Sequence, residues 1–193
     1  KFEALQTTIQ TKHPAYYALK YPQPTSALTL QQQVLQADEA ILIYGVMRES
    51  TLLWVITPQQ FAMLTIEAGA EELDEDVAYL RDVILNRLPE MVDEGFPLYE
   101  KLIPEEAHEL LADTQTLYIV PTGPLYALPF ETLVTEETDY YNPHYLIKDY
   151  AMVYLSSASV LKVLRDSKAG RAIQPSQQFL AFANPAYAPC EED

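Results

Sequence analysis

A short apolar run near the middle of the chain stops abruptly at a proline and a tight turn. The run is Leu117 to Val120, it ends at Pro121, and the turn Thr122-Gly123-Pro124 follows. Such a run favours a buried strand, and the proline and glycine residues favour a fixed turn behind it. The apolar residues that come next lead into an expected helix start: Leu125, Leu128, Pro129, Phe130 and Leu133. The segment therefore predicts strand, turn and helix in close succession.

Other β-rich runs precede this segment. Ala40 to Met47 and Thr51 to Thr57 are separated only by Arg48-Glu49-Ser50, which predicts an antiparallel hairpin. Phe61 to Ile66 is an expected third strand, and Thr29 to Ala37 is an expected helix before the hairpin.

The apolar period then becomes helical between Glu71 and Leu88. Leucine, valine and isoleucine recur there at steps of three or four, which predicts an amphipathic helix. Phe96 to Leu102 and Glu105 to Leu111 are expected as shorter helices. Further on, Tyr150 to Leu155 predicts a strand, which is followed by a helix through Leu164.

The last predicted elements are a loop at Gly170 to Gln178 and a short strand at Phe179 to Ala183. Strands that alternate with helices at this spacing are typical of parallel βαβ units. We therefore expect an α/β fold with a mostly parallel sheet flanked by helices, and with an N-terminal antiparallel hairpin and helices.

Four segments, in this order, resemble the CHAT domain, a caspase- and separase-like cysteine peptidase family. They are Gln31 to Thr57, Leu117 to Val134, Tyr150 to Leu164 and Phe179 to Tyr187. The resemblance implies a caspase-like fold and a Cys–His dyad that hydrolyses peptide bonds. In the family, the His-Gly strand and the Cys strand come after the strand that corresponds to Phe179 to Ala183. The resemblance thus implies that the nucleophile lies outside this chain.

The same resemblance suggests three parts. Residues 1–30 are an expected connector that follows upstream helical repeats, 31–115 are the hairpin and helical part, and 116–193 are the first βα units of the caspase-like core. We expect no catalytic residue here and peptidase activity only after completion by a C-terminal catalytic part. The other expected partners are a protein substrate and an upstream helical-repeat or regulatory module. The alternative is a non-catalytic pseudo-protease module that binds a regulatory partner.

The charge of the chain restricts its partners. It carries 28 acidic and 12 basic residues, a net charge of −16, which disfavours nucleic acid and anionic membrane as direct partners. The charge suits a basic substrate, or it serves solubility alone. No apolar run is long enough to span a bilayer, and a single cysteine fits a reducing compartment, so we expect a cytoplasmic protein.

The isolated reactive side chains offer little chemistry. Cys190 is the only thiol, but Glu191, Glu192 and Asp193 oppose thiolate formation, so we interpret it as an incidental loop thiol. His13, His108 and His144 stand alone, without metal-ligand spacing. With no glycine-rich phosphate loop either, we expect no metal and no cofactor.

Three serines near the end of the predicted strand at Tyr150 to Leu155 are the only site candidates. Ser156, Ser157 and Ser159 could border the substrate groove, because strand ends at one sheet edge line the cleft of such folds. Alternatively Ser156 or Ser157 caps the following helix. Asp139 to Tyr145 is either a partner-binding loop or a plain insertion.

Overall fold

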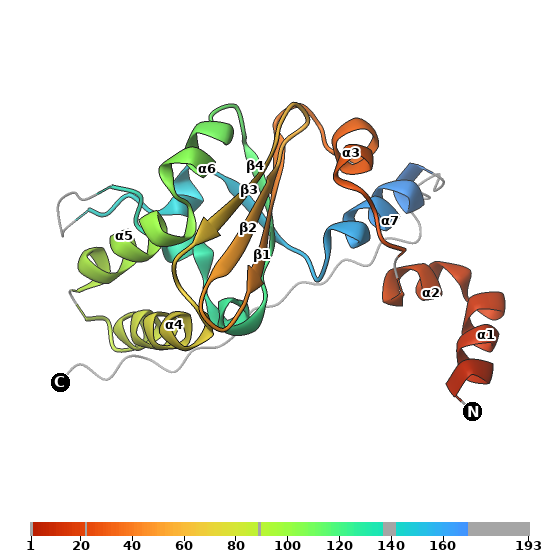
Figure 1. The fold of residues 1–193 in the computed structure, drawn as a ribbon, viewed down its shortest axis with the longest axis horizontal. Coiled ribbons are helices and arrows are strands. Elements are labelled where there is room, and N and C mark those ends of the chain that lie inside the picture. The colour runs from red at the N-terminus through yellow and green to blue at the C-terminus, as the bar shows by residue number, and fades with distance from the viewer. Residues whose placement is uncertain (1, 22, 89, 137–141, 170–193) are drawn as a thin grey trace, which may run out of the picture.

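The protein is built around a five-stranded sheet, shown here by a computed structural model that describes residues 2–21, 23–88, 90–136 and 142–169 (Figure 1). The strands are β1 (Glu39–Val46), β2 (Thr51–Ile56), β3 (Phe61–Ile66), β4 (Thr116–Val120) and β5 (Ala151–Tyr154), in the spatial order β3-β2-β1-β4-β5. β1, β2 and β3 pair antiparallel, whereas β1, β4 and β5 pair parallel. The α/β fold with its N-terminal hairpin is thus confirmed.

One face of the sheet is covered by α4 (Ala70–Leu85), α5 (Met91–Leu102) and α6 (Glu105–Leu110). The buried residues of α4 are Leu73, Val77, Leu80 and Val83, which follow the predicted helical spacing. The helix ends at Leu85, three residues before the predicted end. α5 begins five residues before the expected Phe96, although it contains Gly95 and Pro97. Packing of α5 against the core therefore outweighs these two weak helix formers.

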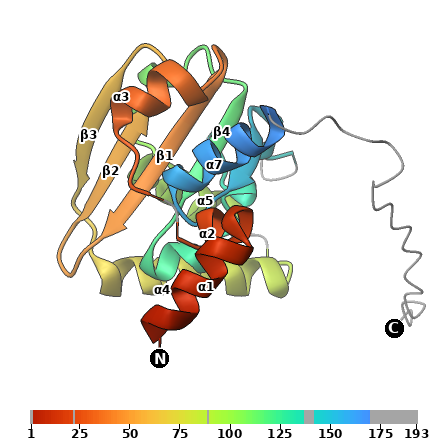
Figure 2. The ribbon, with the colours of Figure 1, turned by 90° about the vertical axis from the view of Figure 1, so that its right-hand side faces the viewer.

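The other face carries α3 (Ala27–Thr29), which continues as the π-helical turn η1 (Leu30–Val34), and α7 (Ala158–Ala169) (Figure 2). Leu30 and Leu161 are buried there against Ile41 of β1. An ion pair between Arg165 and Glu39 fastens α7 to the start of β1, and Tyr118 donates a 3.0 Å hydrogen bond to the same carboxylate. The sheet is therefore sandwiched between two helical layers.

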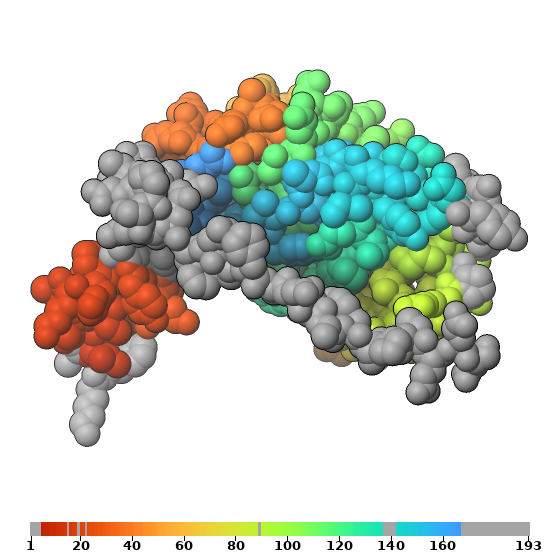
Figure 3. Space-filling model, turned by 180° about the vertical axis from the view of Figure 1, so that it is seen from behind, coloured from red at the N-terminus to blue at the C-terminus, as the bar shows by residue number. Residues whose placement is uncertain are grey.

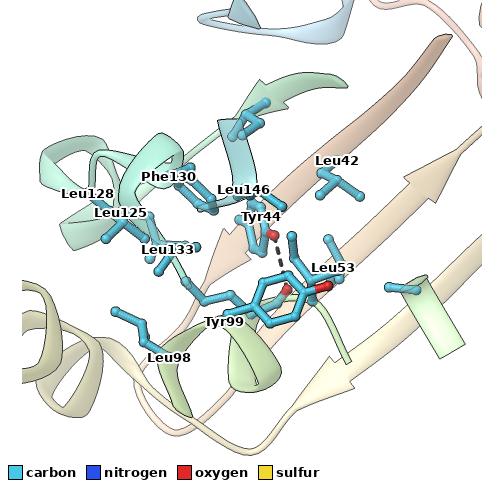
Figure 4. Packing of buried hydrophobic residues seen from close by; sticks show 14 of the residues in the cluster. Leu42, Tyr44, Leu53, Leu98, Tyr99, Leu125, Leu128, Phe130, Leu133 and Leu146 are labelled. Carbon is cyan, nitrogen blue, oxygen red and sulfur yellow. Dashed lines mark hydrogen bonds between the residues drawn. The ribbon is translucent and has the colours of Figure 1, made fainter. Parts of the chain in front are cut away.

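The segment after β4 differs from its prediction. In place of a helix it forms the short 3-10 turns η2 (Gly123–Ala127) and η3 (Phe130–Thr132), followed by η4 (Leu146–Lys148). Pro124 and Pro129 lack a backbone N–H and restrict the residues before them, so a longer helix cannot propagate. The turns nevertheless bury Leu125, Phe130 and Leu133 completely, in the cluster around Tyr44 (Figure 4).

The N-terminal region is helical. α1 (Phe2–Lys12) and α2 (Pro14–Lys20) project beyond α7, as Figure 1 and Figure 2 show. The division of the chain at residues 30 and 115 stays a prediction. The loop at 170–178, the strand at 179–183 and Cys190 lie outside the described residues. Among the described helices, none has the length and apolar character needed to cross a membrane.

Because Tyr44 is buried, we expect the protein to lose stability at alkaline pH. Its side chain is fully buried, its hydroxyl donates a 3.0 Å hydrogen bond to the Leu102 carbonyl, and burial raises the pKa of the phenol well above 10. Below pH 10 both folded and unfolded states hold the proton. Above pH 10 only the unfolded state releases it, so the free energy of unfolding falls by about 1.4 kcal/mol per pH unit for this group.

Urea unfolding between pH 8 and 11, a range that brackets the ordinary phenol pKa of roughly 10, measures this pH dependence of the unfolding free energy. Tyr44→Phe should make the alkaline decline of the unfolding free energy shallower by that amount. The same decline in both proteins would contradict the assignment to Tyr44.

Candidate functional site

The parallel strands β1, β4 and β5 end at one edge of the sheet, the C-terminal edge. In open α/β sheets this edge is where ligands and reacting groups assemble. Thr122, two residues after β4, ties the end of that strand to β1. Its Oγ1 accepts a 2.9 Å hydrogen bond from the Val46 amide and donates one of 2.9 Å to the Tyr44 carbonyl. Gly123 beside it has a φ of 56°, a backbone geometry that favours glycine. The turn is therefore held rigidly at this edge.

Two of the predicted serines lie at the same edge, after β5. The Leu155 amide donates a 2.8 Å hydrogen bond to the Ile119 carbonyl, and the chain then leaves the sheet at Ser156. Ser156 is exposed, whereas the Ser157 hydroxyl is enclosed and has no hydrogen-bond partner among the described residues. The Ser157 side chain thus does not cap the following helix as expected. The Val160 amide donates its hydrogen bond to the Ser157 backbone carbonyl instead of the Ser157 hydroxyl, at 3.1 Å.

The third predicted serine is placed differently. Ser159 Oγ accepts a 3.1 Å hydrogen bond from the Thr25 amide, and Ser159 lines a cavity shared with Tyr17 and Tyr21. Its side chain therefore packs toward the N-terminal helices. A role in lining a substrate groove stays a prediction for all three serines.

A tyrosine that sequence reasoning assigned only to a strand also shapes this region. Tyr154 at the end of β5 donates a 2.6 Å hydrogen bond to Glu131 and accepts one of 2.9 Å from the Phe130 amide. Burial, and next the Glu131 carboxylate, raise the pKa of this phenol well above 10, so it stays neutral at ordinary pH. The bonds join β5 to the turn segment. No sequence signal marks this contact, since 23 residues separate the partners.

The histidines lie elsewhere. His108 is in α6, before β4, and His144 precedes β5, so both are at the opposite, N-terminal ends of these strands. His144 Nε2 lies 2.7 Å from an Asp149 carboxylate oxygen, and His13 is exposed between α1 and α2. Within the described ranges there is no group of three or more His, Cys, Asp or Glu residues that could hold a metal ion.

A comparison with known families gives one match. A family model described as the CHAT domain matches residues 93–192, just over half of the chain. The match contains the turn segment after β4, β5 and α7, and it begins after β1, β2 and β3. No curated protein matches the chain.

Proposed function

Because this chain belongs to the CHAT domain family, within the caspase-like peptidases, we propose that it is the N-terminal, non-nucleophile part of a cysteine protease. In this proposal the chain supplies the sheet on which a C-terminal part places a catalytic His and Cys. The thiolate of that Cys attacks the peptide carbonyl carbon, and the His protonates the leaving amine. Water then hydrolyses the thioester and restores the thiol.

The observation that carries this proposal is the exposed state of β5. Within the described residues β5 pairs only with β4, and Val153 and Tyr154 are 39% and 41% exposed. Strands in parallel sheets are usually buried between neighbours and covering layers. A free edge on a parallel strand supports the addition of further strands there, in line with the family's later His and Cys strands.

The position of the described histidines also supports a catalytic Cys–His dyad that is supplied from outside this chain. His108 and His144 lie at the N-terminal ends of β4 and β5. Thr122 and Ser156 lie at the opposite, C-terminal ends of these strands. In the proposed enzyme, Ser156 and Ser157 form part of the substrate-groove wall, and the exposed Ser156 is available to a peptide backbone group.

A peptidase assay tests the proposal. The purified 193-residue chain should not hydrolyse casein or peptide substrates, because it lacks the nucleophile. A longer protein from the same gene, with the C-terminal part, should hydrolyse them, and Cys190→Ala should leave that activity unchanged. An inactive longer protein that still binds a regulatory partner would favour the alternative, a pseudo-protease interaction module.

A further inference from the structure

The strand β3 forms one border of the sheet, and β5 forms the other. Figure 2 shows β3 as the outermost strand on the side away from α7, whereas Figure 3 views the molecule from behind, where the segments around β5 lie in front. β2 occupies the inner edge of β3, in a register that sets Met63 opposite Trp54. No described element pairs with its outer edge. The proposed function uses the border at β5 and leaves this one without a partner.

Backbone groups of alternate β3 residues point outward along that border. The β2–β3 turn closes with a 3.0 Å hydrogen bond from the Thr57 amide to the Gln60 carbonyl. Hydrogen-bonded and non-hydrogen-bonded pairs then alternate along the antiparallel ladder, so every second residue of β3 bonds to β2. The N–H and C=O groups that point away from β2 belong to the residues between them, Phe61, Met63 and Thr65. Such a row is a template for a further strand.

The side chains of β3 do not prevent such pairing. Edge strands of natural proteins are usually protected by a lysine, a proline or a bulge. β3 reads Phe-Ala-Met-Leu-Thr-Ile, with no charged residue, no proline and no glycine. Phe61 and Met63 are 51% and 58% exposed, and Trp54 is only partly buried beside Met63. The border therefore combines outward backbone groups with exposed apolar side chains, which is typical of a strand that pairs with another chain.

The charges at the two ends of β3 favour a second copy of this chain as the occupant. Antiparallel pairing centred on Met63 sets it opposite Met63 of the second copy, and Phe61 opposite Thr65. The exposed Glu67 then lies opposite the exposed Gln59, whose amide can donate to the carboxylate. Parallel pairing in register would set Glu67 beside Glu67, which is unfavourable. β3 is thus complementary to itself in one orientation, and it carries no charged group that would select a different protein.

We propose that two copies of this protein pair antiparallel through β3 and join their sheets into one. Phe61 and Met63 of both copies then form a continuous apolar row beside Trp54. One pair of six-residue strands is a small contact next to the roughly 1,200–2,000 Å² of standard interfaces, so the dimer forms reversibly and depends on concentration. The inference goes beyond the proposed function and does not depend on peptidase activity, since β5 stays accessible at the other border.

Sedimentation velocity of the 193-residue chain, over a series of concentrations, tests the proposal and should show a monomer–dimer equilibrium. Met63→Lys sets two ammonium groups opposite each other and should raise the dimer Kd about tenfold or more. Val153→Lys is the matched control, because it adds the same charge to the other border strand at a residue that is 39% exposed, and it should leave Kd within about twofold. Circular dichroism checks that both variants are folded. Higher salt should strengthen the dimer, because both copies carry a net charge of −16.

Disulfide crosslinking in a Cys190→Ala background tests the register. Met63→Cys brings two thiols together, because directly opposite hydrogen-bonded residues have Cα atoms about 5.5 Å apart, within disulfide range. Phe61→Cys, also exposed on β3, faces Thr65 of the second copy and should not crosslink. Three results would each overturn the proposal: a chain that stays monomeric, which would leave β3 to a strand of a different protein; a dimer that only Val153→Lys dissociates; or equal crosslinking of both cysteine variants.

Discussion

Phe130→Ala is expected to lower the free energy of unfolding by about 3–5 kcal/mol, the usual range when a large core aromatic is truncated. Phe130 is completely buried, and its ring centroid lies 5.5 Å from that of Tyr44 and 6.3 Å from that of Tyr154. The substitution opens a cavity between the turn segment and the sheet, in the cluster shown in Figure 4. Short 3-10 turns cannot collapse onto it without losing their own contacts.

Urea unfolding followed by the fluorescence of Trp54, the only tryptophan, measures this effect. Tyr126→Ala is the control, because this aromatic residue of the same segment is 65% exposed and should change the unfolding free energy by less than about 0.5 kcal/mol. If Phe130→Ala cost no more than Tyr126→Ala, the turn segment would not be part of the core.

Gly69→Ala should be the second strongly destabilising change, at about 3 kcal/mol, the upper part of the range for overpacking. A Cβ at Gly69 would lie 2.1 Å from the Arg48 carbonyl oxygen and 2.8 Å from the Glu49 Cα. These are backbone atoms of the β1–β2 turn, so they cannot rotate away. The same contact lets the Ala70 amide donate a 2.9 Å hydrogen bond to the Met47 carbonyl, which holds the start of α4 on the hairpin.

Gly123→Ala is the control for Gly69→Ala. It distinguishes the clash of a Cβ with the β1–β2 turn from the general effect of replacing a glycine. Gly123 has a positive φ of 56°, but a Cβ there would meet nothing nearer than Val46, at 3.5 Å. Its expected cost is only about 1 kcal/mol, from the left-handed backbone. Thermal unfolding of both variants should rank Gly69→Ala as clearly less stable. The reverse order would mean that α4 does not start in contact with the turn.

The strands were predictable because their local signals agree with their tertiary environment. β1 and β2 are dense in branched and aromatic residues, and the polar Arg48-Glu49-Ser50 between them leaves room only for a turn. α4 was predictable for a similar reason, since one stripe of its surface is buried and the rest is polar. Where one face is buried along a whole element, the apolar period reports it directly.

Other features depend on contacts between distant residues and leave no local pattern. The turns η2 and η3 follow apolar spacing that also suits a helix, and only the prolines indicate otherwise. Phe61 and Met63 have the composition of a buried strand, yet they are 51% and 58% exposed on β3 at the sheet edge. Composition alone cannot distinguish an edge strand from a central one.

The candidate sites show the same limit. The end of β5 could be located from the sequence because a serine-rich turn follows an apolar strand. The gathering of Glu100, Glu136 and Asp149 around one cavity could not, since these residues come together only when α5 packs beside the chain that precedes β5. The many other acidic residues of the chain conceal these three in the sequence.

In the proposed enzyme this chain supports the catalytic Cys of a CHAT-type protease, and that Cys lies outside residues 1–193. The most direct measurement treats the natural protein with a peptidyl fluoromethyl ketone, which alkylates catalytic cysteines, and maps the modified residue by mass spectrometry. We expect stoichiometric labelling of a cysteine in a part of the protein outside residues 1–193, with Cys190 unlabelled. Labelling of Cys190, together with peptidase activity of the 193-residue chain that Cys190→Ala abolishes, would contradict it.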